Sequence, residues 1–475
     1  MYFTRRMISY RLDSDHHLLI NTLSGALDII DAQIYKTIQG LVAGDLGAAL
    51  QLRSELEARL RKRLYLFDSE EEEAAAFQSL FTAMKQRQER EPLQFAICPT
   101  FACNLRCTYC FEGDLTTGPV KIMTEDQMDH VFQSIERLRD KFHPSSEARV
   151  ILFGGEPLLR PTHSCVEQIL LRSAQKGYGV DIVTNGVDAG HFADLLCAYK
   201  GTIKQIQITL DGPQEVHDKR RLFKGGDGTF EKITANVQRL LELELPITIR
   251  INVDKNNVDS LPRLMEFMDE RGWNLFPNFS CYIFPVTAHA QEAAGNTLEE
   301  DKLLSKVQLM FQGEGKALPA FAVYGFKVLG HVASVIAPES ISLKMPPLFT
   351  YCEANGLRYF GFGPDGMIYP CGQTIGQPDL AIGRFYPEFE LHENTCDAWA
   401  TRSVLTIPEC KECAIATLCG GGCAYGAYKR TGSMLNPNCQ SCGAVVEAYM
   451  DNMKDHLLHR YSGVLSLQER AQPCA

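Results

Sequence analysis

Residues 94–110 read QFAICPTFACNLRCTYC, and this stretch decides how the rest of the chain is interpreted. The apolar run Gln94–Cys98 has the composition of a buried β-strand, so we expect Cys98 to lie in the core. It leads directly into Cys103, Cys107 and Cys110, which are separated by three and two residues. Three thiolates placed so close behind a strand suit one inorganic cluster, and active-site loops of α/β folds follow their strands. The stretch therefore predicts a metal-cluster loop at the head of an α/β domain.

Residues 94–312 alternate strand patterns with helix patterns. This alternation predicts a parallel sheet with right-handed crossovers. Six units are two short of a closed eight-unit barrel, so we expect an α/β fold with an open or partial (β/α)6 barrel. The expected strands are Gln94–Cys98, Arg149–Phe153, Val180–Thr184, Ile203–Thr209, Ile247–Val253 and Phe279–Phe284, and the expected helices include Thr124–Phe142, Asp188–Tyr199, Phe230–Leu245 and Ser260–Arg271.

The rest of the chain divides where the composition changes. Residues 1–68 predict a small winged-helix-like α+β domain, with strands at Met7–Leu12, His17–Asn21 and Ala26–Ile30, a helix capped by Asp31, and a second helix over about residues 46–63. Residues 69–93 open in an acidic run and predict a solvated linker followed by a helix. Residues 313–345 predict a poorly patterned connector. Residues 346–460 predict a cysteine-rich domain with a helix at about residues 444–460, and we expect metal to supply much of its folding energy because periodicity is weak there.

The composition excludes several classes of protein. The net charge of −11 and the lack of a basic face argue against nucleic acid as a partner. The longest apolar stretch, residues 317–337, is interrupted by Pro319, Gly325 and Lys327, so it predicts no membrane span. No apolar segment typical of a signal peptide follows the first residues, and we expect a cytoplasmic protein. In a reducing compartment the 17 cysteines bind metal or perform redox chemistry more often than they form disulfides.

Polar residues and glycines mark the ends of the expected strands. Two glycines before Glu156 allow a close backbone approach, and its carboxylate suits an ammonium group. Asp211 precedes a glycine, so it is read as a ribose ligand, a substrate contact or a turn residue. Arg250 and Asn252 are two apart on one strand and so share a face. The residues singled out here for ligand binding are Tyr109, Gly154, Gly155, Glu156, Thr184, Asn185, Thr209, Asp211, Arg221, Arg250 and Asn252.

A second group of cysteines lies in a Gly- and Pro-rich context near the C-terminal end. Its pattern is Cys352-x13-Gly366-x4-Cys371, then Cys410-x2-Cys413-x5-Cys419-x3-Cys423, then Cys439-x2-Cys442. Two four-iron clusters need about eight thiolates, and these eight cysteines together with Cys396 are enough. Zinc ribbons are the alternative, because CxxC pairs also suit zinc.

The cysteine loop and the strand-end motifs, including the sequence GGEP at residues 154–157, resemble the radical S-adenosylmethionine (SAM) superfamily over residues 94–312. The second group of cysteines is similar to the SPASM extension of that superfamily. The resemblance implies a [4Fe–4S] cluster on Cys103, Cys107 and Cys110, whose open iron binds the amino and carboxylate groups of SAM. An electron from the cluster then releases a 5′-deoxyadenosyl radical. Glu156 would hold the amino group, Tyr109 would pack near the adenine, and Arg221, Arg250 and Asn252 would lie near the carboxylate and ribose.

The SPASM resemblance also implies two auxiliary [4Fe–4S] clusters. An outer cluster would take Cys410, Cys413, Cys419 and either Cys439 or Cys442. An inner cluster would take Cys352, Cys371 and Cys423. Its fourth position would be open to a substrate thiolate or filled by Cys396 or Cys442.

The order of elements in residues 1–68 resembles the peptide-recognition element of enzymes that modify ribosomally made peptides, with a packing subdomain as the alternative. The combination implies a maturase that binds the leader of a precursor peptide as an added strand. We expect it to form cysteine sulfur-to-carbon thioethers and to receive electrons from a flavodoxin- or ferredoxin-type donor. The alternatives are carbon–carbon crosslinking or epimerisation of a peptide, formylglycine formation in a sulfatase, and a non-enzymatic iron–sulfur electron carrier. No catalytic residue is assigned beyond Asp211.

Overall fold

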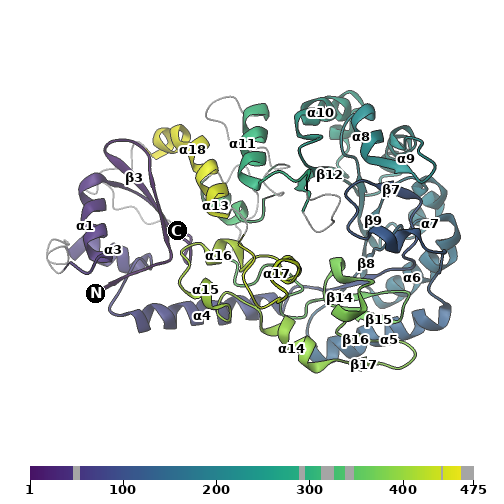
Figure 1. Ribbon diagram of the computed structural model, residues 1–475, viewed down its shortest axis with the longest axis horizontal. Helices are drawn as coiled ribbons and strands as arrows, with labels where there is room; N and C mark the ends of the chain where they lie inside the picture. The colour runs from purple at the N-terminus through teal and green to yellow at the C-terminus, as the bar shows by residue number, and fades with distance from the viewer. Residues whose placement is uncertain are drawn as a thin grey trace.

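A mixed sheet of ten strands forms the centre of the computed structural model, which describes residues 1–45, 54–287, 295–311, 322, 326–336, 347–439 and 442–461. The strand order is β13-β12-β10-β9-β8-β6-β14-β15-β16-β17. Figure 1 shows the N-terminal strands and helices at the left, the cysteine-rich segment in the middle and the helix-covered sheet at the right.

One half of the sheet is parallel and follows the chain order. The strands β6, β8, β9, β10, β12 and β13 are neighbours in that order, and every pair is parallel. This confirms the predicted α/β fold with six strand–helix units. The expected strand ends differ from the observed ones by one residue at most. The observed bounds are Leu93–Ile97 (β6), Ala148–Leu152 (β8), Gly179–Thr184 (β9), Ile203–Thr209 (β10), Ile247–Val253 (β12) and Phe279–Pro285 (β13).

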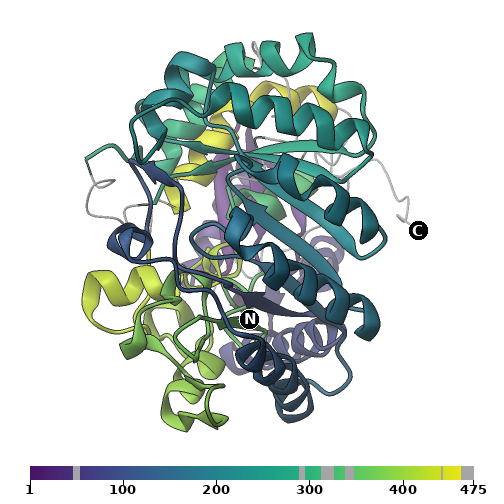
Figure 2. The same cartoon turned by 90° about the vertical axis from the view of Figure 1, so that its right-hand side faces the viewer.

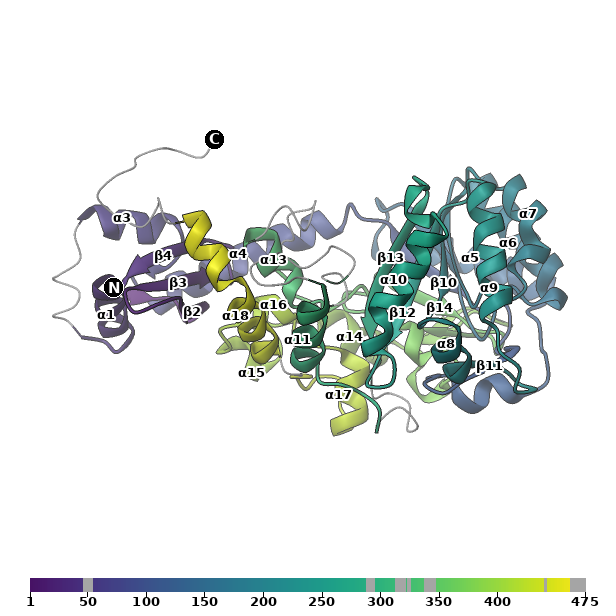
Figure 3. The ribbon, with the colours of Figure 1, turned by 90° about the horizontal axis from the view of Figure 1, so that it is seen from above.

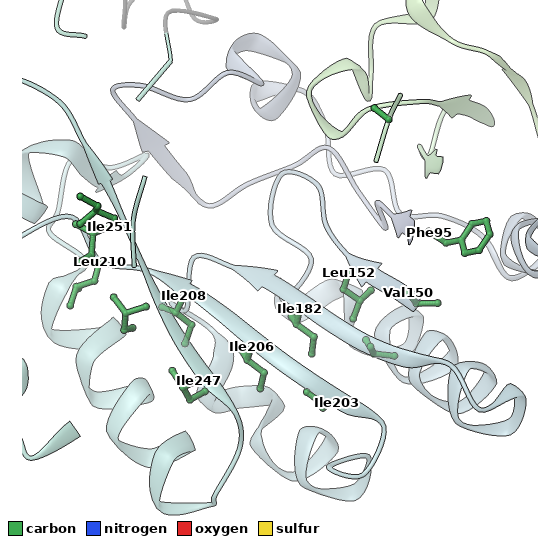
Figure 4. Packing of buried hydrophobic residues seen from close by; sticks show 14 of the residues in the cluster. Phe95, Val150, Leu152, Ile182, Ile203, Ile206, Ile208, Leu210, Ile247 and Ile251 are labelled. Atoms are coloured by element: carbon green, nitrogen blue, oxygen red, sulfur yellow. The ribbon is translucent and has the colours of Figure 1, made fainter. Parts of the chain in front are cut away.

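Helices cover the outer face of this half of the sheet, as Figure 2 shows. The first of them, α5 (Glu125–Phe142), begins where predicted because Thr124 and Gln127 form a reciprocal capping box. Between helices and strands lies an aliphatic core, with Leu152, Ile182, Ile206 and Ile208 pointing to one side of their strands (Figure 4). The other covering helices are α6 (His163–Lys176), α7 (Ala193–Ala198), α9 (Phe230–Glu242) and α10 (Leu261–Glu270).

The cysteine-rich segment continues the same sheet, which corrects the expectation that it lacks a normal core. Strand β14 (Tyr359–Phe362) pairs in parallel with β6, and β15 (Met367–Tyr369), β16 (Gly383–Arg384) and β17 (Glu390–Leu391) follow in antiparallel order. Phe360, Phe362 and Trp399 are buried in the same core as the parallel strands. Strands of two to four residues are too short to produce a recognisable period, so this core could not be predicted.

The N-terminal residues form a three-stranded sheet with helices on it. Its strands β2 (Met7–Arg11), β3 (His16–Asn21) and β4 (Leu27–Asp31) match the prediction, as does α1 (Ala32–Val42), whose first turn is capped by Asp31. The second predicted helix is described from α3 (Ser54–Lys62) onward, and residues 46–53 lie outside the described part of the chain. A short antiparallel pair, β1 (Tyr2–Phe3) with β5 (Leu66–Phe67), closes this unit.

The charge of the acidic run suggested a solvated linker. The structure shows instead that its residues form the first turn of the helix α4 (Glu70–Gln88). Ser69 caps this helix by accepting a hydrogen bond from the amide of Glu72. Acidic residues in a first turn are stabilised by the positive end of the helix. A run of acidic residues is therefore compatible with a helix start as well as with a solvated linker. Glu73 is buried and accepts a hydrogen bond from Thr4. Figure 1 shows α4 extending along the lower edge of the molecule from the N-terminal unit.

The helix α18 (Cys442–Tyr461) confirms the prediction for the C-terminal part. Of the predicted connector, residues 326–336 are described and include α13 (Leu329–Ile336). Figure 3 shows α18, α13 and α11 (Glu300–Phe311) between the N-terminal strands and the parallel sheet. Among the described helices, none has both the length and the apolarity that crossing a membrane requires.

Candidate active site and metal centres

The cysteine loop leaves the end of β6 and is held by an element that the sequence did not predict. The strand β7 (Leu105–Cys107) pairs antiparallel with β11 (Arg221–Phe223), and the register sets Cys107 opposite Arg221. The Sγ atom of Cys103 accepts weak hydrogen bonds from the amide of Leu105 at 3.4 Å and from Nδ2 of Asn185 at 3.8 Å. Strands of three residues carry no periodic signal, which explains why this pair was missed.

The thiols of this loop are poorly solvated. Burial raises the pKa of Cys103 to about 12 and that of Cys107 to about 11, while the neighbouring Arg221 acts to lower the pKa of Cys107. Burial also raises the pKa of Cys110. Thiolates are the form that binds metal, so a positively charged metal centre is needed to hold these three sulfurs ionised at neutral pH.

Glu156 joins the ends of two neighbouring strands. Its Oε1 accepts a hydrogen bond from Oγ1 of Thr184 and its Oε2 accepts one from the amide of Asn185, both at 2.6 Å. Burial raises the pKa of Glu156 to about 7, although these hydrogen bonds act to lower it. Asn185 in turn contacts Cys103, so the structure brings Glu156, Thr184 and Asn185 together beside the cysteine loop.

Gly154 and Gly155 are required by the cysteine loop itself. A Cβ atom on Gly155 would lie 2.2 Å from the carbonyl oxygen of Phe101, and one on Gly154 would lie 2.3 Å from Sγ of Cys98. Gly154 also has a φ of +123°, which side chains rarely allow. The sequence suggested that these glycines make room for a ligand. The structure shows that they make room for residues 98–102, which lead into Cys103.

The hydroxyl of Tyr109 forms hydrogen bonds with three of the residues singled out in the sequence. It donates to Oδ2 of Asp211 at 2.5 Å and accepts from Nη1 of Arg221 at 2.8 Å and from Nδ2 of Asn252 at 3.2 Å. Arg250 donates from Nε to Oδ1 of Asn252 at 2.9 Å, which confirms that the two share a strand face. Nε of Arg221 is buried and has no hydrogen-bond partner among the described residues. An unpartnered guanidinium nitrogen at this point fits an anionic group of a bound ligand.

Asp211 is fully buried and is held by hydrogen bonds and an ion pair within the protein. It is 0% exposed, and its Oδ1 accepts the amide of Asn252 at 3.0 Å. Its ion-pair partner is Arg220, which the sequence reading missed and which also pairs with Asp254 at 2.7 Å. Thr209 lies in register with Arg250 on the next strand and takes no part in the described contacts of this network. The available signal for Arg220 was the pair of consecutive arginines at the end of α8 (Gln214–Arg220), where Arg220 is the last residue of the helix and Arg221 follows it.

The cysteines of the second group separate into two sets. In the inner set, Cys352 and Cys423 both act to raise the pKa of Cys371. In the outer set, Cys413, Cys419 and Cys439 act to raise the pKa of Cys410. Like charges influence one another only at short range in such a site, so each set is a compact group of thiols.

Of the two remaining candidate cysteines, Cys442 contacts the outer set and Cys396 lies apart from both sets. Cys442 donates a hydrogen bond to Cys419, which lowers the pKa of Cys419 to about 7 and raises that of Cys442. Cys396 donates to the carbonyl of Ile382 at 3.6 Å, and the charges that act on it come from Lys141, Asp397 and Glu393 rather than from any cysteine. Cys396 is therefore separate from both sets.

Three consecutive glycines connect the two sets. Gly420, Gly421 and Gly422 have φ values of +62°, +82° and +73°. A Cβ atom on Gly420 would lie 2.6 Å from the carbonyl of Thr350, and one on Gly422 would lie 2.2 Å from the carbonyl of Asn438. These close approaches bring the chain before Cys352 and the chain before Cys439 onto the loop between Cys419 and Cys423.

No three His, Cys, Asp or Glu side chains of the described residues converge closely enough to share one metal ion. A structural zinc ion takes four ligands at about 2.0–2.3 Å from one point, and the described residues contain no such group. A four-iron cluster distributes its thiolates over separate iron atoms, so wider groups of thiols suit it better. The donors are all sulfur, which also fits iron–sulfur clusters.

The chain around Cys371 of the inner set lies against the first site. Buried Cys98, Tyr369 and Ile375 form one apolar cluster, to which Phe101 and Phe153 are added from the loops around Cys103 and Glu156. The chain after Cys371 lies on these loops, because a Cβ atom on Gly376 would be 3.4 Å from Phe101. Beside the cysteine loop there is also a polar pocket of about 370 Å³, lined by Thr108, Val216, Lys219, Arg220, Asn256 and Asn296.

Comparison with known proteins agrees with this geometry. The family model described as the Radical SAM superfamily matches residues 97–268. Those residues form a radical SAM core, and the chain is an enzyme. Proteins of this superfamily bind SAM and a [4Fe–4S] cluster.

Relatives of known name cover most of the chain. The AdoMet-dependent heme synthase of Methanosarcina barkeri is 25% identical over 348 residues, which is 72% of this chain and 94% of the relative. The cysteine-type anaerobic sulfatase-maturating enzyme of Clostridium novyi is 24% identical over 339 residues, which is 68% of this chain and 84% of the relative. The solved structure of native anSMEcpe with bound AdoMet and Cp18Cys peptide has a TM-score of 0.56 and 19% identity, and covers 78% of this chain and 99% of that chain. It supports the fold.

Proposed function

We propose that this chain is a peptide-modifying radical SAM enzyme that forms thioethers between a cysteine sulfur and a carbon of a ribosomally made precursor peptide. One observation carries the proposal: Tyr369 and Ile375, which flank Cys371 of the inner set, share an apolar cluster with the loops of the first site. A sulfur bound at the inner set would lie next to the place where the radical arises, which thioether formation requires.

The first site would hold its cofactors as follows. Cys103, Cys107 and Cys110 would bind a [4Fe–4S] cluster, which supplies the electron that cleaves SAM. Glu156 would accept hydrogen bonds from the amino group of SAM, and the free Nε of Arg221 would bind its carboxylate. Tyr109, Arg250, Asn252, Thr209 and Asp211 would shape the ribose and adenine side, with Asp211 acting through Tyr109 rather than by direct contact.

The second group of cysteines would hold two further [4Fe–4S] clusters. Cys410, Cys413, Cys419 and Cys439 would bind the outer one, since Cys439 acts on the other thiols of its set. Cys352, Cys371 and Cys423 would bind the inner one. Because Cys442 is hydrogen-bonded to Cys419 and Cys396 lies apart, the fourth inner position would stay open for the thiolate of the substrate.

Residues 1–68 would bind the leader of the precursor peptide. Strand β4 is at the edge of its sheet, and a groove between β4 and α3 is lined by Leu19, Ile29, Leu56 and Leu60 together with Arg59 and Arg63. A leader strand added to β4 would gain main-chain hydrogen bonds and would lie beside these apolar side chains. In the same division of the chain, residues 69–93 would be a linker helix, 94–312 the barrel, 313–345 a connector and 346–460 the auxiliary-cluster domain.

The N-terminal unit also contacts the loop of the outer set. Thr22, at the end of β3, donates from Oγ1 to the carbonyl of Ala414 at 2.6 Å, and Thr417 donates to the carbonyl of Thr22 at 2.5 Å. This contact supports a leader-binding unit that is fixed relative to the clusters rather than tethered loosely.

The test is an anaerobic reaction of the reconstituted enzyme with SAM, dithionite and any short cysteine-rich peptide that is found encoded beside its gene. We expect 5′-deoxyadenosine, and a peptide that loses two hydrogens per crosslink and no longer reacts with a thiol reagent. The triple variant of Cys103, Cys107 and Cys110 to Ala is the control and should form neither product. A peptide that loses two hydrogens while every thiol stays reactive would contradict thioether formation and indicate carbon–carbon crosslinking.

Formylglycine formation in a sulfatase is the second candidate. It is favoured by the similarity to the sulfatase-maturating enzyme of Clostridium novyi. Incubation with a sulfatase-derived peptide distinguishes the two, because formylglycine is an aldehyde that reacts with hydrazides and a thioether does not.

A further inference from the structure

Arg402 is a buried cation in the middle of the cysteine-rich segment. It follows α14 (Glu393–Thr401), and its side chain is 0% exposed. Its guanidinium donates four hydrogen bonds, all to main-chain carbonyl oxygens. They go from Nε to Met434 at 2.6 Å, from Nη1 to Gly422 at 2.8 Å, and from Nη2 to Gly421 at 2.9 Å and to Asn436 at 3.1 Å.

No carboxylate pairs with Arg402 in the described part of the chain; the acidic groups that act on it are the thiols of Cys423, Cys352, Cys410 and Cys419. The buried Arg220 is a contrast within the same molecule, because it pairs with both Asp211 and Asp254. An unpaired buried cation costs several kcal/mol, which four carbonyl dipoles offset in part. The charge of Arg402 is therefore not neutralised by any carboxylate of the described residues, and an anion of another kind would be needed to balance it.

The position of Arg402 indicates where that anion would be. It binds the carbonyls of Gly421 and Gly422, which lie between Cys419 of the outer set and Cys423 of the inner set. A Cβ atom on Gly421 would lie 3.7 Å from Nη1 of Arg402 and 3.8 Å from Sγ of Cys410. Nη1 of Arg402 and Sγ of Cys410 therefore both lie within 4 Å of the same point.

We propose that Arg402 is the built-in counter-charge of both auxiliary clusters, raising their reduction potentials and fixing the 419–423 loop that joins them. This inference rests on the proposed function, which places iron–sulfur clusters at the two sets. A [4Fe–4S] cluster with thiolate ligands carries a net negative charge, and reduction adds one more. A nearby cation favours the reduced form, so charge around the cluster is one of the factors that set its potential. Arg402 is a positioning residue, since it acts on the clusters through charge and through the loop.

The test uses the full chain with Cys103, Cys107 and Cys110 changed to Ala, so that the auxiliary clusters are observed alone. Iron and sulfide per chain are measured, and the clusters are titrated electrochemically with detection by EPR. Arg402→Gln removes the charge. We expect the ratio of reduced to oxidised cluster at a fixed potential to fall at least tenfold, which is about 59 mV for a one-electron couple.

Two further variants separate charge from packing. Arg402→Lys keeps the charge and should hold the ratio within threefold of the parent. Arg384→Gln removes an exposed cation of the same segment, which pairs with Glu390, and should leave the ratio unchanged. If Arg402→Gln loses iron while Arg402→Lys keeps it, the cation is needed to hold the clusters, which also supports the inference.

Other results overturn it. If Arg402→Gln keeps its full iron content and the reduction potentials of the auxiliary clusters do not change, Arg402 is not a counter-charge. The proposed function is not affected by that result. Equal shifts in Arg402→Gln and Arg402→Lys assign the effect to packing and exclude a counter-charge. Absence of iron from the parent triple variant refutes the auxiliary clusters themselves, so the two failures are distinguishable.

Discussion

Changing Tyr109 to Phe removes one oxygen atom that three side chains share. The hydroxyl donates to Asp211, which is 0% exposed, and accepts from Arg221 and Asn252. A hydrogen bond to a charged group contributes about 1.5–3 kcal/mol, and each buried donor left without an acceptor costs about 1–3 kcal/mol. Since neighbouring effects are not additive, we expect a local destabilisation of about 2–4 kcal/mol.

The amide of Asn252 is a suitable probe, because it donates to the same carboxylate, at Oδ1 of Asp211. Native-state hydrogen exchange of the cofactor-free chain should show a faster exchange of this amide by roughly thirty-fold to several-hundred-fold, at 1.4 kcal/mol per factor of ten. The iron bound at Cys103, Cys107 and Cys110 should also fall, because Tyr109 lies within their loop.

The matched control is Tyr199→Phe, since the half-buried Tyr199 has no described hydrogen bond through its hydroxyl. We expect its exchange rates to stay within threefold of the parent. If Tyr109→Phe behaves in the same way as Tyr199→Phe, the hydroxyl does not hold the network together and the reasoning is refuted.

Three other changes test the remaining geometry. Gly155→Ala sets a methyl 2.2 Å from a carbonyl oxygen and should lower the free energy of unfolding by about 1–3 kcal/mol in chemical denaturation, whereas Gly201→Ala enters open space with ordinary φ and should not. Cys439→Ala should remove one auxiliary cluster by iron analysis and Mössbauer spectroscopy, while Cys442→Ala should retain both; the reverse pattern would exchange their assignments. Burial raises the pKa of Glu156 from 4.5 to about 7, so its protonated form contributes stability below pH 4.5 that is lost as the pH rises through about 7. The melting temperature of the cofactor-free parent should therefore fall relative to Glu156→Gln over this range, and a constant difference would contradict the burial argument.

Much of the site follows from the sequence because the chemistry is local. The spacing of Cys103, Cys107 and Cys110 behind one strand, and the order of the later strands, were readable from residue types and hydrophobic pattern alone. The division of the second group into inner and outer sets came instead from the spacing of the family that it resembles, and it stays a prediction.

What the tertiary structure decided depends on contacts between segments that are distant in the sequence. Only the fold places Tyr109 against Asp211 and Asn252, which are 102 and 143 residues away, and turns an expected adenine contact into the centre of a hydrogen-bond network. Likewise, β14 extends the sheet beside β6, although more than 250 residues separate them in the printed sequence. A short strand or a single polar side chain is too small to show a periodic pattern in the sequence. Its partner also depends on how the whole chain packs. The sequence by itself indicated which residues are candidates for binding metal and cofactor, and the tertiary structure determined which of these residues lie together.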